Sequence, residues 1–249
     1  LRHGLCSKPS NHQIAPDIKQ TIIDLYKSKY KIFEFNYDHY CEMLSIHEGI
    51  IAKPDCVRKW LRALKLTLPR KRGTKKITVW REPKAYFNEM VQIDGTFGYF
   101  LGNGKLQCLM HLVDDATGTS MAILCDAECT QSALLLLYKW CVKYGIPKSI
   151  YSDRHSTYKV IDRKHLTVEE ELEGQELKLS EFGKVCRNLG INHIFAYSPQ
   201  AKGRVENKHK LYKDRGVKEI KLLNYKTMEE VNHFLSKEGG FTDRLNLRF

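Results

Sequence analysis

Three acidic residues stand in local contexts that suit a metal site. Asp94 lies at the centre of a predicted strand, Asp153 directly follows a short apolar strand, and Glu206 stands early in a predicted helix. Two carboxylates on strands and one on a helix can converge on one point and bind a divalent cation. Bound metal is the usual means of breaking phosphodiester bonds without a covalent enzyme intermediate. The sequence therefore predicts a metal site for phosphodiester chemistry.

The elements that must position these acids occupy residues 89–236, which we expect to form one α/β unit. Alternating polarity predicts a strand over residues 91–96, in which Asp94 faces away from Val91 and Ile93. Two turn signals then predict a second and a third antiparallel strand, over 106–113 and 120–125. The order continues as helix, strand, helix, strand, helix and helix, at residues 130–144, 149–152, 180–189, 191–197, 201–222 and 228–235. This order predicts a mixed five-stranded sheet flanked by helices.

The first 68 residues are predicted to be helical, with helices at 16–30, 36–48 and 54–66. The third helix buries one apolar stripe and presents a basic face opposite it. A helix pair with a basic second helix is typical of the helix-turn-helix, in which that helix enters the major groove of DNA. The alternative is a three-helix bundle with a solvated basic face. That face consists of Arg58, Lys59, Arg62 and Lys65.

Positive charge is concentrated near the start of the chain. The net charge is +12, and residues 1–90 carry 18 Lys or Arg against 9 Asp or Glu. A basic linker is expected at 69–88, and its first part lacks any hydrophobic period. Such a distribution indicates a polyanion partner, most often nucleic acid, although a generally basic soluble protein remains an alternative. The predicted DNA contacts here are Lys53, Arg58, Lys59, Arg62, Arg70, Lys71, Arg72, Lys75 and Lys76.

Four short strings carry a resemblance to a known family. They are VQIDG at 91–95, VDDATG at 113–118, YSDRH at 151–155 and YSPQAKGRVE at 197–206. With the order of elements, they resemble bacterial insertion-sequence DDE transposases that have a retroviral-integrase-type catalytic core, in the group not classified elsewhere. The resemblance covers nearly the whole chain and implies a ribonuclease H-like fold.

The resemblance makes Asp94, Asp153 and Glu206 the catalytic and metal-binding triad. It implies two Mg²⁺ ions per active site, with Mn²⁺ able to substitute. It also implies double-stranded DNA partners, namely the element's terminal repeats and the target, and a homodimer or higher multimer on DNA. Further DNA contacts are expected around the triad, with a structural or solvent-exposed role as the alternative for each. They are His155, Lys202, Arg204, Lys210 and Lys213.

One departure from the family pattern lies between the second and third acids. The interval from Asp153 to Glu206 holds 52 residues, longer than in many integrase relatives, and a Glu-rich stretch at about 159–178 accounts for the excess. We interpret this stretch as an inserted surface segment, and its acids are competing candidates for the third ligand. Asp115 is expected to be a turn residue, with an approach to the site as the alternative.

The remaining features concern the cellular compartment and the two ends of the chain. The eight cysteines form no CxxC pair, which favours buried free thiols in a reducing, cytoplasmic environment rather than a zinc site. No apolar run is long enough to span a membrane. The chain starts without Met, so we expect a piece of a longer polypeptide, and residues 237–249 are expected to begin a C-terminal segment.

The leading hypothesis is a DNA transposase that binds element ends and performs metal-dependent cleavage and strand transfer. One alternative is a structure-specific nuclease of the same fold, which would also need Mg²⁺. Another is a non-catalytic, domesticated DNA-binding regulator, against which the three acids argue.

Overall fold

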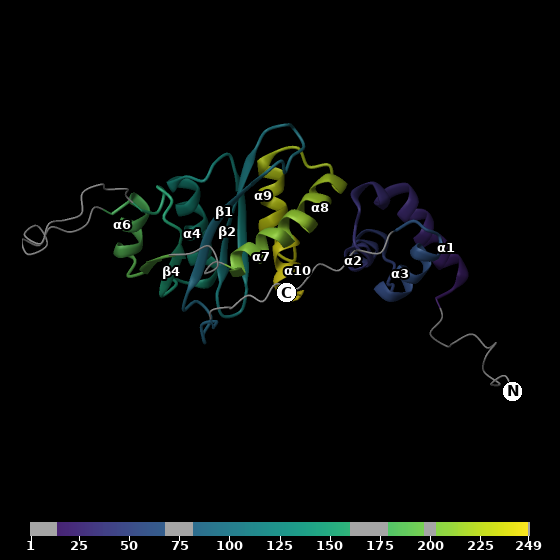
Figure 1. The fold of residues 1–249 in the computed structure, drawn as a ribbon, viewed down its shortest axis with the longest axis horizontal. Helices are drawn as coiled ribbons and strands as arrows, with labels where there is room; N and C mark the ends of the chain where they lie inside the picture. Colours follow the sequence, from purple (N-terminus) through teal and green to yellow (C-terminus); the bar gives the residue numbers. More distant parts are fainter. Residues whose placement is uncertain (1–13, 68–81, 160–178, 197–202, 249) are drawn as a thin grey trace, which may run out of the picture. The chain divides into compact units, whose positions relative to one another are not determined.

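The computed structural model describes residues 14–67, 82–159, 179–196 and 203–248 (Figure 1). The chain divides into two compact units, residues 1–76 and 77–249, and the division falls within the predicted basic linker. Several predicted features lie outside the described residues. They are Arg70, Lys71, Arg72, Lys75, Lys76, Lys202 and nearly all of the Glu-rich segment.

The N-terminal unit contains three α-helices: α1 (Pro16–Leu25), α2 (Tyr37–Glu48) and α3 (Pro54–Ala63). The predicted first helix is α-helical only as far as Leu25, because a π-helical turn and a 3₁₀ turn follow over residues 26–33. The ends of α2 are as predicted. Asn36 caps its start by accepting a hydrogen bond from the His39 N–H, and Gly49 ends it with φ of 66°.

The C-terminal unit is built on a five-stranded sheet. Its strands are β1 (Val91–Gly98), β2 (Gln107–Asp114), β3 (Ser120–Cys125), β4 (Ser149–Ser152) and β5 (Asn192–Phe195). The spatial order is β3-β2-β1-β4-β5. Strands β1, β2 and β3 pair antiparallel, whereas β1, β4 and β5 pair parallel. The mixed five-stranded sheet predicted from the sequence is confirmed.

Helices cover both faces of this sheet (Figure 1). On one face, α4 (Thr130–Tyr144) and α6 (Glu181–Asn188) pack on a core that includes Ile93 and Met110. The other face carries Leu109 and Ala122, which pack against the C-terminal helices. Those are α7 (Gly203–Leu211), α8 (Val217–Leu222), α9 (Met228–Ser236) and α10 (Phe241–Arg248).

The structure adds two details to the predicted C-terminal helices. The predicted helix over 201–222 is interrupted by a π-helical turn at Tyr212–Gly216. Within the stretch predicted to begin a C-terminal segment, α10 packs against α9 and β3, and Phe241 and Leu245 are buried.

The buried-thiol prediction holds for only part of the described cysteines. Cys41, Cys108 and Cys186 are buried free thiols, but Cys129 is exposed at the start of α4. In the described ranges, no helix has the length and apolar character needed to cross a membrane.

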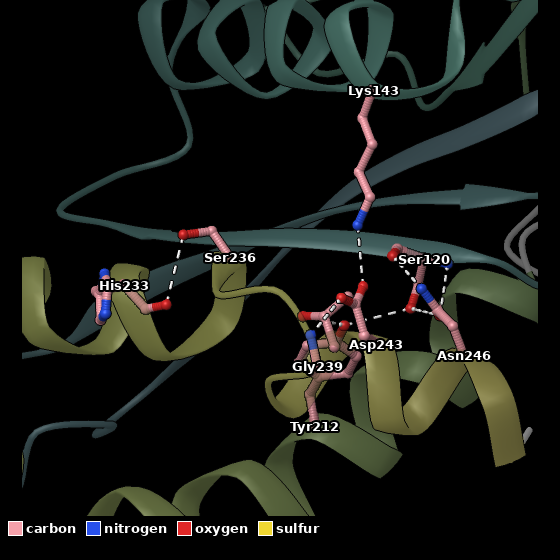
Figure 2. A network of polar contacts seen from close by, with 9 residues as sticks. Ser120, Lys143, Tyr212, His233, Ser236, Gly239, Asp243 and Asn246 are labelled. Atoms are coloured by element: carbon pink, nitrogen blue, oxygen red, sulfur yellow. Dashed lines mark hydrogen bonds and ion pairs between the residues drawn. The ribbon is translucent and has the colours of Figure 1, made fainter.

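Two asparagines pair with the outer edge of β3. Asn246 on α10 accepts from the Ser120 N–H and donates to the Ser120 carbonyl, at 2.8 Å each (Figure 2). Asn232 on α9 does the same with Leu124, at 2.7 and 2.8 Å. An open edge strand presents unpaired backbone groups that invite association with other chains. The amides therefore satisfy the edge of the sheet and tie α9 and α10 to it.

We expect Asn246→Ala to destabilise the C-terminal unit by about 1–3 kcal/mol, because it removes both partners of the Ser120 backbone. The free energy of unfolding from urea titration is the measurement. Asn207→Ala is the matched control, since Asn207 is exposed on α7. We expect Asn207→Ala to change the free energy of unfolding by no more than about 0.5 kcal/mol. Equal losses in the two variants would contradict the role given to the edge contacts.

Candidate active site

Asp94 lies in the middle of β1, and Asp153 directly follows the neighbouring parallel strand β4. Gln92 of β1 pairs with Tyr151 of β4, and extending this register by two residues aligns Asp94 with Asp153. Paired strands lie about 4.8 Å apart. Both acids also act electrostatically on the same neighbour, Glu128. The fold therefore brings together two of the three predicted ligands, which are 59 positions apart in the sequence.

Helix α7 carries the third acid alongside β1. The Val205 N–H donates to Gln92 Oε1 at 3.3 Å, and His209 Nδ1 lies 3.8 Å from Asp94 Oδ2. The four-position step from Val205 to His209 rises about 6 Å along the helix, close to the rise of the two-position step from Gln92 to Asp94 along the strand. Glu206 lies between the two contacts and about one turn before His209, hence on the same side of the helix.

The three carboxylates are not gathered into a formed metal site. Across the described residues, no group of three or more His, Cys, Asp or Glu side chains is arranged to hold a metal ion. The triad thus stays a prediction. The donor set nevertheless fits the ion it implies, because Mg²⁺ prefers oxygen ligands and few carboxylates. Close acids also repel one another when no cation neutralises them.

Glu128, in the loop between β3 and α4, is a fourth acid that the sequence analysis missed. Its Oε1 accepts a hydrogen bond from the Tyr158 hydroxyl at 3.1 Å. Burial raises the pKa of the Glu128 carboxyl above its usual value, and the charges of Asp94 and Asp153 raise it further. No periodicity could reveal it, since it lies outside any strand or helix.

Two buried histidines and a buried lysine lie near Asp94, on β2 and α7. His111 is the cross-strand partner of Asp94 and is fully buried, and its ring centroid is 4.6 Å from that of His209. Burial, together with the His209 and Lys208 charges, holds the pKa of His111 well below its usual range. Burial also lowers the pKa of Lys208. His111 is therefore neutral at ordinary pH and adds no positive charge beside Asp94.

Asp115 lies in a turn, as predicted, and is also a buried structural anchor. It is fully buried, and its carboxylate accepts hydrogen bonds from Gln92 Nε2 and the Lys84 N–H at 2.8 Å each. Arg204 Nε lies 3.3 Å from Asp115 Oδ1. Because Gln92 also accepts from the Val205 N–H, Asp115 fixes the start of α7, and with it Glu206. Arg204, predicted to contact DNA, is thus engaged in an internal ion pair.

Three other predicted DNA contacts of the C-terminal unit, His155, Lys210 and Lys213, are on the surface. His155 is exposed, and its backbone N–H donates to Asp153 Oδ1 at 2.9 Å. A second hydrogen bond joins His155 Nδ1 to the Thr157 hydroxyl. Lys210 is exposed on α7, and Lys213 is exposed in the π-helical turn that follows.

In the N-terminal unit, the basic face of α3 is exposed as predicted. Lys53 and Lys59 are exposed there. Arg58 forms an ion pair with Asp55 at 2.7 Å, and Arg62 packs its guanidinium over the Tyr37 ring. Arg62 Nε also donates to the Tyr37 hydroxyl at 3.4 Å. Lys59 is therefore the cleanest position at which to test DNA binding.

Comparison with known proteins supports the resemblance seen in the sequence. No family model matches the chain. It is 28% identical over 254 residues to the inferred transposase y4bF of Sinorhizobium fredii (strain NBRC 101917 / NGR234), covering 100% of this chain and 52% of that protein. It is 26% identical over 271 residues to the transposase for insertion sequence IS1202 of Streptococcus pneumoniae, covering 94% and 56%. The chain therefore spans about half the length of the curated relatives it matches.

Among solved structures, the HTLV-2 integrase catalytic core domain in complex with magnesium aligns at a TM-score of 0.44 and 15% identity, over 64% of this chain and 97% of that one. In sequence, the chain is similar to transposases over almost its full length. More particularly, it resembles the insertion-sequence transposases.

Proposed function

We propose that the chain is the DNA-binding and catalytic part of a DDE-type transposase, a polynucleotidyl transferase that cleaves element ends and joins them to target DNA. The observation that carries this proposal is the parallel pairing of β1, which contains Asp94, with β4, which Asp153 directly follows, while α7 is held along β1. The similarity to two transposases over almost all of this chain supports it.

Within this proposal, Asp94, Asp153 and Glu206 hold two Mg²⁺ ions, with Mn²⁺ able to substitute. Bound there, the ions would activate the attacking water or 3′-hydroxyl and stabilise the leaving 3′-oxygen. The protein's own contribution is to place the three carboxylates. Asp115 and Gln92 fix the start of α7, and the parallel pairing of β1 and β4 sets the spacing of the two aspartates.

A strand-transfer assay separates this function from its alternatives. The chain is incubated with Mg²⁺, a supercoiled target and element-end DNA with a recessed 3′-hydroxyl. Joined products indicate a transposase, and cleavage without joining indicates a nuclease of the same fold. Binding without metal-dependent cleavage would indicate a regulator and contradict the proposal.

The N-terminal unit supplies duplex DNA binding through α3 in this account. We expect Lys59→Gln to weaken binding, because a phosphate contact is lost. The slope of log affinity against log salt should become shallower by about 0.9. Fluorescence anisotropy between 50 and 300 mM KCl measures it, with an element-end duplex as probe.

Lys27→Gln is the matched control for this measurement. Lys27 is an exposed lysine of the same unit, outside α3, and the substitution changes the charge equally. Its slope should stay at the wild-type value. An equal change in both variants would mean that net charge, and not the face of α3, sets the affinity.

Joining two DNA ends requires two active sites, so we propose that a homodimer or higher multimer acts on DNA. The proposed partners are the element's terminal repeats and the target duplex. Action on DNA places the protein inside the cell, in association with DNA.

A further inference from the structure

We propose that Glu128 is a positioning residue of the active site, which bridges β1 to the turn that follows Asp153 and so sets the separation of Asp94 and Asp153. This inference rests on the proposed function. It rests on three features of the described residues: a close backbone approach, a hydrogen bond to a buried anchor, and the proximity of both aspartates.

The first feature is the contact between Glu128 and Gly95, the residue directly after Asp94. A Cβ atom on Gly95 would lie 2.5 Å from Glu128 Oε2 and 2.8 Å from its carboxyl carbon. Any side chain at this position would therefore displace the carboxylate. The backbone of Gly95 does not adopt a positive φ, so its conformation does not require glycine. The close approach of Glu128 is therefore the reason we give for a glycine after Asp94.

The second feature is the anchor on the other side of the carboxylate. Tyr158, whose hydroxyl donates to Glu128 Oε1, is buried and packs edge-on against Phe182 of α6, with ring centroids 5.2 Å apart. Its carbonyl accepts a hydrogen bond from the Ser180 hydroxyl. Tyr158 lies five positions after Asp153, at the end of the turn that leaves β4. Glu128 thus joins a fixed point beyond Asp153 to the backbone beside Asp94.

The third feature is electrostatic. The charges of both Asp94 and Asp153 bear on Glu128 and also on Tyr158, which places the four side chains in one neighbourhood. A carboxylate in this place adds negative charge beside the two predicted ligands. Residues behind metal ligands that fix their orientation typically change metal affinity by about 10–100-fold when removed.

Three variants of the full chain test this role. Glu128→Ala removes the bridge, Tyr158→Phe removes only its hydroxyl, and Glu128→Gln keeps an acceptor of the same size. Glu229→Gln, on the exposed face of α9, is the control for loss of one negative charge. Mg²⁺ binding without DNA is measured by calorimetry, and end joining is measured over a Mg²⁺ titration. Circular dichroism checks the fold.

We expect Glu128→Ala to raise the Mg²⁺ concentration for half-saturation by about tenfold in both measurements, and Tyr158→Phe by about threefold. Glu128→Gln should recover most of the loss, and the double variant Glu128→Ala, Tyr158→Phe should be no worse than Glu128→Ala alone. Glu229→Gln should match the wild type. If Glu128→Ala does not fold, the metal affinities of Tyr158→Phe and Glu128→Gln are compared to test whether the hydrogen bond between the two residues matters.

Half-saturation within twofold of wild type in folded Glu128→Ala would overturn the inference, as would independent, additive effects of Glu128 and Tyr158. In the fallback comparison, wild-type metal binding by Tyr158→Phe would do the same. These failures leave the proposed function intact provided that the wild type binds Mg²⁺ and joins DNA. A wild type that does neither overturns the proposed function itself.

Discussion

Asp94→Asn is expected to abolish both cleavage and end joining while leaving DNA affinity within about twofold of the wild type. The amide keeps the size of the side chain but removes the charge that a divalent cation requires. Metal stabilisation of the reacting oxygens contributes several kcal/mol. A loss of at least about 1,000-fold in rate, or about 4 kcal/mol, is therefore expected. Single-turnover joining of a radiolabelled element end measures the rate.

Asp126→Asn provides the matched control for Asp94→Asn. Asp126 is exposed in the loop after β3, in the same unit. Its rate should remain within a few-fold of the wild type, because nothing in the account gives it a metal ligand's role. If Asp94→Asn joins DNA at the same rate as Asp126→Asn, Asp94 has no role in the reaction.

Asp115→Ala is expected to destabilise the C-terminal unit by about 3 kcal/mol, the scale observed when one partner of a buried charged network is removed. The substitution leaves Gln92 Nε2 and the Lys84 N–H without their buried acceptor. It also leaves Arg204 without its counterion. Guanidinium chloride titration measures the free energy of unfolding. Joining by the folded fraction should also fall, since the start of α7 loses its anchor.

Asp115→Asn distinguishes the two consequences. The amide oxygen can still accept one of the hydrogen bonds, so part of the stability should return, whereas the attraction to Arg204 is lost. Wild-type unfolding free energy in Asp115→Ala would contradict the anchoring role. Normal stability with lost joining would instead bring Asp115 into the reaction.

The sequence predicted the sheet well because its signals are local. Alternation around Asp94, the turns after β1 and β2, and Gly145 at the end of α4 each specify an element within a few residues. The same periodicity placed Asp94 on the polar face of β1. What it could not provide was the register of β1 against β4, which aligns Asp94 with Asp153 and depends on packing between distant segments.

The roles that the sequence did not predict share a physical cause. Glu128 lies in a short irregular loop, and its importance comes from Gly95 and Tyr158, which are far from it in sequence. Asp115 resembles a turn former in its local context, and only burial shows it to be an anchor. His111 lies opposite Asp94 because of the antiparallel register, which no local pattern specifies.

The predicted DNA contacts show the limit of reading charge from a sequence. Exposure of Lys59 on α3 agrees with the expected basic face. Arg204, which has the same formal charge, instead forms an ion pair with the buried Asp115. Charge counts indicate the kind of partner, but the neighbours of each side chain decide which cations are available to it.

The central claim is that Asp94, Asp153 and Glu206 bind the same divalent ions. The most direct test is the anomalous difference map of crystals of this chain grown with Mn²⁺ and element-end DNA. The account predicts peaks within about 2.3 Å of carboxylate oxygens from all three residues. Peaks coordinated instead by acids of the segment at 159–178, with Glu206 turned away, would contradict it.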